Sequence, residues 1–149
     1  MKQDQIYPQD VTVDTPLEIL NLSNKDTLME SLGMEYTSVK MGEICGKMIV
    51  DRRTHQPAGL LHGGAKLALA ETLAGMGSAV MVDLREYSVV GFQVSGNHVG
   101  TVQQGFVYGF ANILHKGKNT HVWNIDIKDE NGRLISTCRV TNMIIPRKK

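Results

Sequence analysis

The segment from residue 67 to residue 82 constrains this chain most, because it is almost wholly apolar or small and yet contains one carboxylate, Glu71. Its only other hydrogen-bonding side chains are Thr72 and Ser78. A helix that is apolar on nearly every face is normally buried. A charge in such a helix costs several kcal/mol unless it is paired, hydrogen-bonded or protonated. That cost suggests that Glu71 is present for its chemistry.

Length and composition indicate one globular domain. The chain has 149 residues, of which 42% are apolar and 21% are charged, and this is long enough to bury a real core. We expect a mobile tail over residues 1–14 and a single domain over residues 15–149. The net charge of +1 argues against a nucleic-acid partner. The longest apolar run is shorter than the roughly 20 residues of a membrane span, so we expect no membrane partner.

The two cysteines, Cys45 and Cys138, have no C-x-x-C spacing and no matching histidine cluster that would indicate zinc. We therefore expect reduced thiols, a cytoplasmic location, no bound metal and no redox cofactor. The chain also has no glycine-rich phosphate-binding loop after a strand.

The expected elements follow one another in the order of an α+β domain. They are a short helix over residues 15–22, a helical piece over 26–32, two strands within 34–51, one long helix over 64–84, and four strands over 87–99, 105–115, 120–128 and 133–145. In the last turn, Asn131-Gly132 is expected to supply positive φ angles. A sheet curled around the long helix would cover part of it, and a second subunit could cover the rest.

Two motifs carry a resemblance to a known family. The stretch from Arg53 to Ala65, followed by Ala70-Glu71, resembles the hot-dog acyl-CoA thioesterases of the phenylacetyl-CoA and hydroxybenzoyl-CoA type, in which a curved antiparallel sheet wraps one long central helix. The pattern is most similar to the 1,4-dihydroxy-2-naphthoyl-CoA thioesterases of menaquinone biosynthesis. The likeness continues through Asn97-His98-Val99 and His121-Val122-Trp123, so that it spans about residues 33–145.

The resemblance implies hydrolysis of an aromatic or medium-length acyl-CoA, with coenzyme A as part of the substrate and no separate cofactor. Glu71 would activate water or attack the thioester carbonyl itself, and the sequence does not separate these mechanisms. Gly63 would donate to the developing oxyanion at a helix N-terminus, while Gln56 and His62 would orient the carbonyl. Substrate contacts are expected at Gly64, Thr72, Gly75, Asn97, His98 and Lys118.

These residues also have ordinary structural interpretations, and the chain departs from its relatives in two places. Glu71 could face solvent on one exposed strip of the helix, and Gln56 and His62 could simply stabilise their loop. Relatives often have Ser or Thr four residues after the glutamate, where this chain has Gly75, and relatives of the naphthoyl type tend to have Arg where it has Gly100. The coenzyme A phosphates would then need other cations, for which the candidates are Lys116, Lys118 and Arg139.

The spacing of Gly63 and Glu71 predicts an oligomer. Eight residues separate them, which is about 12 Å along a helix, whereas one carbonyl must meet both groups at about 3 Å. Two antiparallel helices related by a twofold axis could bring Gly63 of one subunit to Glu71 of the other. We therefore expect an obligate homodimer, paired again into a dimer of dimers.

A second class of function remains open at this point. A hot-dog protein could bind acyl-CoA or another small apolar ligand without hydrolysing it, and the missing hydroxyl at Gly75 favours that alternative. Glu71 favours an enzyme. Hot-dog dehydratases, a further alternative, generally pair a histidine with an acidic residue, and the apolar helix contains no histidine.

Overall fold

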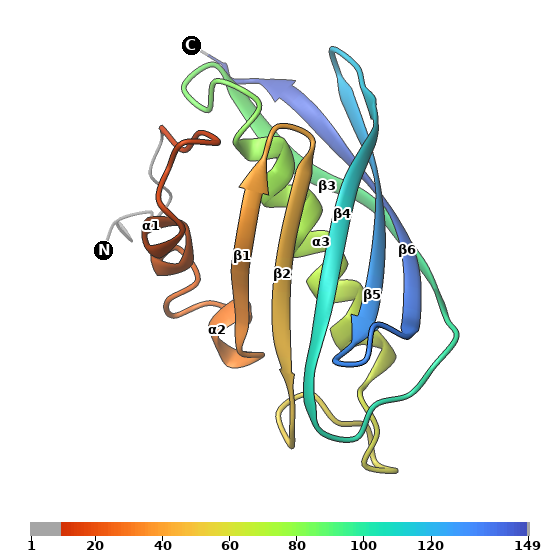
Figure 1. Cartoon of the computed structure of the whole chain (residues 1–149). Coiled ribbons are helices and arrows are strands. Elements are labelled where there is room, and N and C mark those ends of the chain that lie inside the picture. Colours follow the sequence, from red (N-terminus) through yellow and green to blue (C-terminus); the bar gives the residue numbers. More distant parts are fainter. Residues whose placement is uncertain (1–9, 149) are drawn as a thin grey trace.

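The computed structural model describes residues 10–148 and contains one antiparallel six-stranded sheet that curves around a long helix (Figure 1). In spatial order the strands are β1 (Met34–Lys40), β2 (Glu43–Val50), β4 (Gly105–Lys116), β5 (Thr120–Asp129), β6 (Leu134–Pro146) and β3 (Tyr87–His98). The long helix α3 (Gly63–Ala79) packs against this sheet, and the short helices α1 (Leu17–Leu22) and α2 (Leu28–Ser31) lie beside β1. The predicted α+β hot-dog architecture is confirmed.

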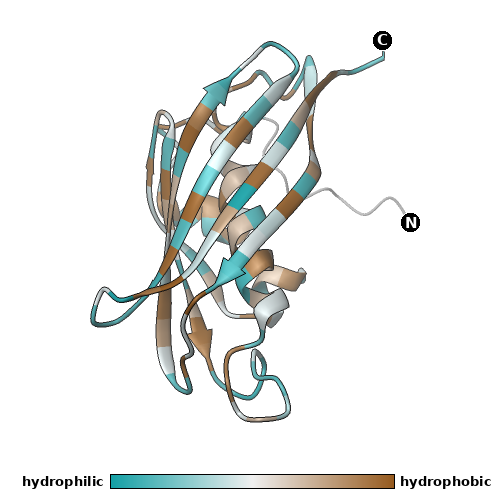
Figure 2. Ribbon diagram, turned by 90° about the vertical axis from the view of Figure 1, so that its right-hand side faces the viewer, coloured by the Kyte–Doolittle hydropathy of each residue, from teal (hydrophilic) through white to brown (hydrophobic). Residues whose placement is uncertain are grey.

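Alternating side chains build the core on the helix side of the sheet, and Figure 2 shows the resulting bands of colour along the strands. In β2 every second residue from Ile44 to Val50 is buried. Leu73 of α3 fits into a gap between Gly46 and Gly109, which are directly paired on β2 and β4. A Cβ atom at either glycine would come within 2.6 Å of Leu73, so these small residues set how closely the helix approaches the sheet.

A buried polar cluster fixes the C-terminal end of α3 on the sheet. The Ser78 hydroxyl accepts hydrogen bonds from Trp123 Nε1 (2.9 Å) and Asn142 Nδ2 (3.0 Å), and it lies 3.0 Å from His121 Nδ1. Because two donors occupy the oxygen lone pairs, the hydroxyl proton is donated to His121, which is therefore the neutral Nε2–H tautomer. Burial lowers the pKa of His121, as do the nearby charges of Lys116 and His115.

The helix predicted over 64–84 is shorter in the structure, because α3 ends at Ala79. Residues 80–86 form turns instead, and in one of them the Asp83 carboxylate accepts the Arg85 N–H at 2.9 Å. Val80 and Leu84 remain buried. The apolar pattern therefore continued past the helix because the following turns also pack against the core.

Two further expectations need correction or restriction. In the β5–β6 turn only Gly132 has a positive φ, and Asn131 does not; the Asp129 carboxylate instead accepts the backbone N–H groups of Asn131 and Arg133 and closes the turn. At the N-terminus, residues 1–9 of the predicted tail lie outside the described residues. Val11 is buried in the core, so packed structure begins before residue 15.

Candidate active site

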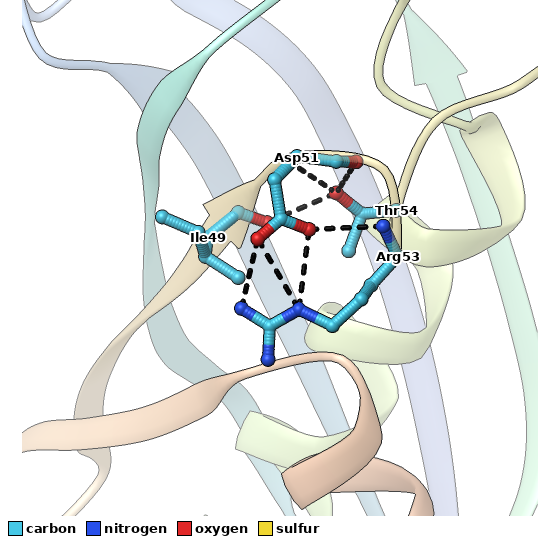
Figure 3. A network of polar contacts seen from close by, with 4 residues as sticks. All are labelled: Ile49, Asp51, Arg53 and Thr54. Atoms are coloured by element: carbon cyan, nitrogen blue, oxygen red, sulfur yellow. Dashed lines mark hydrogen bonds and ion pairs between the residues drawn. The ribbon is translucent and has the colours of Figure 1, made fainter.

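The loop between β2 and α3 carries Gln56 and His62, and its first turn is held by the polar contacts in Figure 3. The Asp51 carboxylate accepts hydrogen bonds from the backbone and guanidinium of Arg53, and these contacts lower the pKa of Asp51. The buried Thr54 hydroxyl donates to the Ile49 carbonyl at 3.0 Å. The Thr54 carbonyl in turn accepts the His62 N–H at 2.8 Å, which sets the position of the residue that precedes the helix.

His62 is the N-cap of α3, and its side chain accepts a hydrogen bond from one of the two glycine N–H groups that follow it. Its Nδ1 accepts the Gly64 N–H at 2.8 Å, so in the neutral imidazole the proton is on Nε2, which is available as a donor. The Gly63 N–H belongs to the first turn, where backbone donors have no partner within the helix and the helix dipole favours negative charge. Of the two glycines, Gly63 is therefore the better oxyanion donor.

Gln56 is half-buried in the middle of this loop. Its Oε1 accepts the Ala58 N–H, and its backbone carbonyl accepts the Gly59 N–H at 2.9 Å. The carboxamide oxygen is thus used within the loop, which leaves the NH₂ group as the end that can donate to a substrate carbonyl.

His98, at the end of β3, lies directly against the start of α3. A Cβ atom at Gly63 would be 2.9 Å from His98 Nε2, so only a glycine allows the ring this close. His98 Nδ1 lies 2.9 Å from the Ser136 hydroxyl, which itself donates to the carbonyl of the neighbouring Asn97 at 3.2 Å. Burial lowers the pKa of His98, as do the charges of Lys66 and His62. The structure therefore groups the predicted residue His98 with His62 and Gly63, whereas Asn97 takes part only through its backbone carbonyl.

Glu71 does not lie in the core, which differs from the burial that the sequence suggests. In the single chain Glu71 is exposed, and its neighbours on the same side of α3, Leu67, Thr72 and Gly75, are half-buried. Its carboxylate is close to β3, because a Cβ atom at Gly91 would be only 2.5 Å from Glu71 Oε1. The carboxylate thus lies where the helix meets the edge strand.

A groove of about 280 Å³ adjoins Glu71. Its lining includes the predicted residues Thr72 and Gly75 and is otherwise mostly apolar, with Leu28, Met29, Tyr36, Ala68 and Met76. The sequence analysis missed Leu28, Met29 and Tyr36, since they lie at least 35 residues before Glu71 in the chain. The only sequence signal was an amphipathic segment near residue 28 that leaves Leu28 exposed.

Lys66 is the charged residue of α3 that the sequence analysis overlooked. Its side chain is only 3% exposed, and its Nζ donates one long hydrogen bond, 3.4 Å, to the Gly100 carbonyl. Burial lowers the pKa of Lys66, and the nearby Cys138 partly offsets this shift. The buried charge in this helix is therefore a lysine in its first turn rather than the glutamate.

Lys118 is not brought to the same end of the molecule as Gly63. It lies in the β4–β5 turn, where α3 ends, whereas Gly63 lies at the opposite end of the sheet (Figure 1). Lys116 lies at the same turn, and Arg139 lies in the middle of β6, opposite Ser95 and Asn124. Within one chain these three cations therefore do not form a single anion site with the helix N-terminus.

Neither a metal cluster nor a membrane-spanning helix is found in residues 10–148. The described part of the chain contains no group of three or more His, Cys, Asp and Glu side chains that could hold a metal ion. No helix in the same range is long and apolar enough to cross a membrane.

Comparison with known proteins agrees with the fold. Residues 58–136 match the Thioesterase superfamily. The chain is 43% identical over 129 residues to the proofreading thioesterase EntH of Cronobacter turicensis, covering 87% of this chain and 93% of that protein. It is 46% identical over 125 residues to a Vibrio cholerae protein named as an esterase, covering 84% and 83% of the two chains.

Solved structures give the same result. A crystal structure of a thioesterase from Pseudomonas aeruginosa superposes with a TM-score of 0.88 at 38% identity, covering 92% of this chain and 99% of that one. A thioesterase from Haemophilus influenzae gives a TM-score of 0.84 at 35% identity, covering 88% and 91%. The chain therefore belongs to the hot-dog Thioesterase superfamily. It is a thioester hydrolase.

Proposed function

We propose that this protein hydrolyses acyl-CoA thioesters in a site shared between two subunits, with Glu71 of one chain as base or nucleophile and the Gly63 N–H of the other as oxyanion donor. The observation that carries the proposal is that both residues lie on one continuous helix, Gly63 at its first position and Glu71 beside the groove. Their separation of about 12 Å along the helix axis is too large for one carbonyl to contact both within a chain.

The lining of the groove beside Glu71 favours a substrate with an apolar acyl group. Leu28, Met29 and Met76 offer only apolar contacts, and Tyr36 adds a ring. A volume of about 280 Å³ lies at the small end of ligand sites, which favours an aromatic or medium-length acyl group over a long fatty chain. The 1,4-dihydroxy-2-naphthoyl group is one candidate of this size. A proofreading role, in which the enzyme removes wrongly loaded acyl groups, is a second candidate function, because relatives at 41–43% identity are named proofreading thioesterases.

The uncovered surfaces support a dimer. Glu71 of α3 is exposed in the single chain, and β3 is exposed over most of its 12 residues. A second copy that adds its own β3 to this edge would extend the sheet and place the two α3 helices antiparallel. Each dimer would then contain two sites, and two dimers could pair again into a tetramer.

Two structures of one solved relative add support for Gln56 and Glu71. A Staphylococcus aureus protein, 37–38% identical to this chain, was crystallised once with a glutamine and once with a glutamate replaced by alanine. The two substituted residues are fifteen positions apart in that protein, which is the spacing of Gln56 and Glu71 in this one. Both positions were thus selected for substitution in a relative.

The first experiment measures release of free thiol from a panel of acyl-CoAs by the wild-type protein and by Glu71→Gln. The variant keeps the size of the side chain and removes its charge, so kcat should fall by about 10²–10⁴-fold with little change in KM. Normal turnover by Glu71→Gln would remove Glu71 from the mechanism. A wild-type protein that binds acyl-CoA but releases no thiol would favour the ligand-binding alternative.

The second experiment tests whether the site is shared. Glu71→Gln subunits are mixed and refolded with subunits that carry both Gln56→Ala and His62→Ala. A mixed dimer then has one site with both lesions and one intact site, so random pairing should restore about a quarter of wild-type activity. Each variant refolded alone is the control. Mixed dimers that remain inactive would show that every site lies within one chain.

A further inference from the structure

Lys66 occupies a position that is unfavourable for a lysine on three counts. It is 3% exposed, although lysine is rarely buried without a charged partner. The only described hydrogen bond of its side chain is the 3.4 Å contact to the Gly100 carbonyl, and a carbonyl dipole offsets little of the desolvation of an ammonium group. It also lies in the first turn of α3, where the helix dipole disfavours a cation. The free-energy cost of burying Lys66 at this position suggests that the residue has a function.

The geometry brings this ammonium group to the oxyanion donor. Lys66 is three residues after Gly63, hence on the same face of the helix, and helical side chains lean toward the N-terminus. His98 approaches Gly63 from β3, with its Nε2 at 2.9 Å from the position of a Gly63 Cβ. Gly100, which accepts the hydrogen bond from Lys66, follows His98 by two residues. The helix start, the imidazole and the ammonium group therefore form one cluster.

We propose that Lys66 is a positioning residue that supplies a buried positive charge behind the oxyanion site, and that it acts through the Gly63 N–H and the His98 imidazole. This inference rests on the proposed function. A positive charge in a dry environment stabilises the negative oxygen that forms at Gly63, because low dielectric strengthens the attraction. The same charge opposes protonation of His98 and thereby keeps that ring neutral.

Other groups near His98 are consistent with this role. The His62 ring, the Ser136 hydroxyl and the Cys138 thiol surround the cluster, and none of them carries a negative charge at neutral pH. Burial raises the pKa of Cys138, so that its thiol stays protonated. No described carboxylate is paired with Lys66 among the ion pairs of residues 10–148. The charge of Lys66 is therefore not cancelled locally.

The test uses Lys66→Met, which keeps the length of the side chain and removes the charge, and Lys66→Gln, which keeps a donor for the Gly100 carbonyl. Both should lower kcat by about tenfold, less than the loss of a direct oxyanion donor, with KM nearly unchanged. The melting temperature of Lys66→Met should be equal to or higher than that of the wild type, since a costly buried charge is removed. NMR titration should show a higher pKa for His98 in both variants. Lys40→Met, at an exposed lysine at the end of β1, is the matched control and should change none of these quantities.

Three outcomes would overturn the inference. They are an unchanged kcat in both variants, a His98 pKa that does not move, or a kcat loss that follows loss of folded protein in the melting curves. If Lys66→Met does not fold, Lys66→Gln carries the same comparison. Failure of the proposed function can be distinguished from failure of this inference. If the proposed function fails, the wild-type protein is inactive but the pKa of His98 can still be measured by titration. If only the inference fails, the wild type is active and the pKa of His98 is the same in the variants.

Discussion

The two edge strands of the sheet, β1 and β3, differ in how far other residues of the chain cover them. At the β1 edge, Asn21 of α1 accepts the Tyr36 N–H at 2.8 Å and donates to the Tyr36 carbonyl at 3.1 Å, as a neighbouring strand would. Asn24 donates to the Met34 carbonyl at 3.1 Å. At the β3 edge the strand is exposed over most of its length, and Phe92 is 72% exposed.

The difference favours the β3 edge as the interface of the proposed dimer. Open edges invite pairing with another chain, and proteins normally cover or charge the edges that they do not use. Here the covered edge borders the groove beside Glu71 through Tyr36, and the open edge contains Gly91, against which the Glu71 carboxylate lies. An open strand with an exposed aromatic side chain next to a candidate catalytic group is the pattern expected of an interface that completes the site.

The largest effect is expected from charging the open edge. Phe92→Lys places an ammonium group where the second β3 would pair, so the dimer should dissociate. Turnover should then fall by at least about 100-fold, because each site loses the oxyanion donor of its partner. Size-exclusion chromatography with light scattering and the thiol-release assay measure both effects. Leu22→Lys, at another exposed apolar residue in α1, is the control. A dimeric, active Phe92→Lys protein would refute the assignment of the β3 edge.

A smaller effect is expected from adding one methyl group to the same strand. The Cβ of Gly91→Ala would collide with Glu71 Oε1, and since this is the end of a flexible side chain, the fold should tolerate it. The displaced carboxylate should lower kcat by about 10–100-fold. In the Glu71→Gln background the same change should have little further effect, because the two lesions act on one group. Fully additive losses would contradict the contact.

The proposed acyl groove lies on the β1 side of Glu71, so changes to its lining should alter substrate selectivity rather than assembly. Met29→Ala enlarges the groove, and kcat/KM for a longer acyl group relative to a shorter one should rise by about tenfold. Met41→Ala, exposed in the β1–β2 turn, should leave the ratio unchanged. An unaltered chain-length profile in an active Met29→Ala enzyme would place the acyl group elsewhere.

The smallest effect on turnover is expected at the covered edge itself. Asn21→Ala removes the partner of the Tyr36 backbone groups and should lower the free energy of unfolding by about 1–3 kcal/mol, with kcat nearly unchanged. Denaturant unfolding measures the loss, and Asn112→Ala on the exposed face of β4 is the control. A variant that became monomeric or inactive would remove the distinction between the two edges.

Most of the elements could be predicted because they depend on short-range patterns. The alternation in β2, the turn at Gly42 and the apolar run of α3 are all visible within a few residues of sequence. The end of α3 at Ala79 could not be predicted in this way, since Val80 and Leu84 continue the apolar pattern into turns that are also buried. Gln56, His62, Gly63 and Glu71 came from the resemblance, and their catalytic roles remain predictions.

The sequence by itself determined the order of the elements, the family and the residues able to do the chemistry, because these follow from side-chain type and local spacing. Only the tertiary structure decided that Lys66 is buried and Glu71 exposed, because burial depends on partners such as Gly91 and Gly100, which lie 20 and 34 residues away. It also decided which sheet edge is open, because the side chains that cover β1, Asn21 in α1 and Asn24 just after that helix, bond to backbone groups 15 and 10 residues distant. Such contacts form only when the chain folds back on itself, and no local pattern records them.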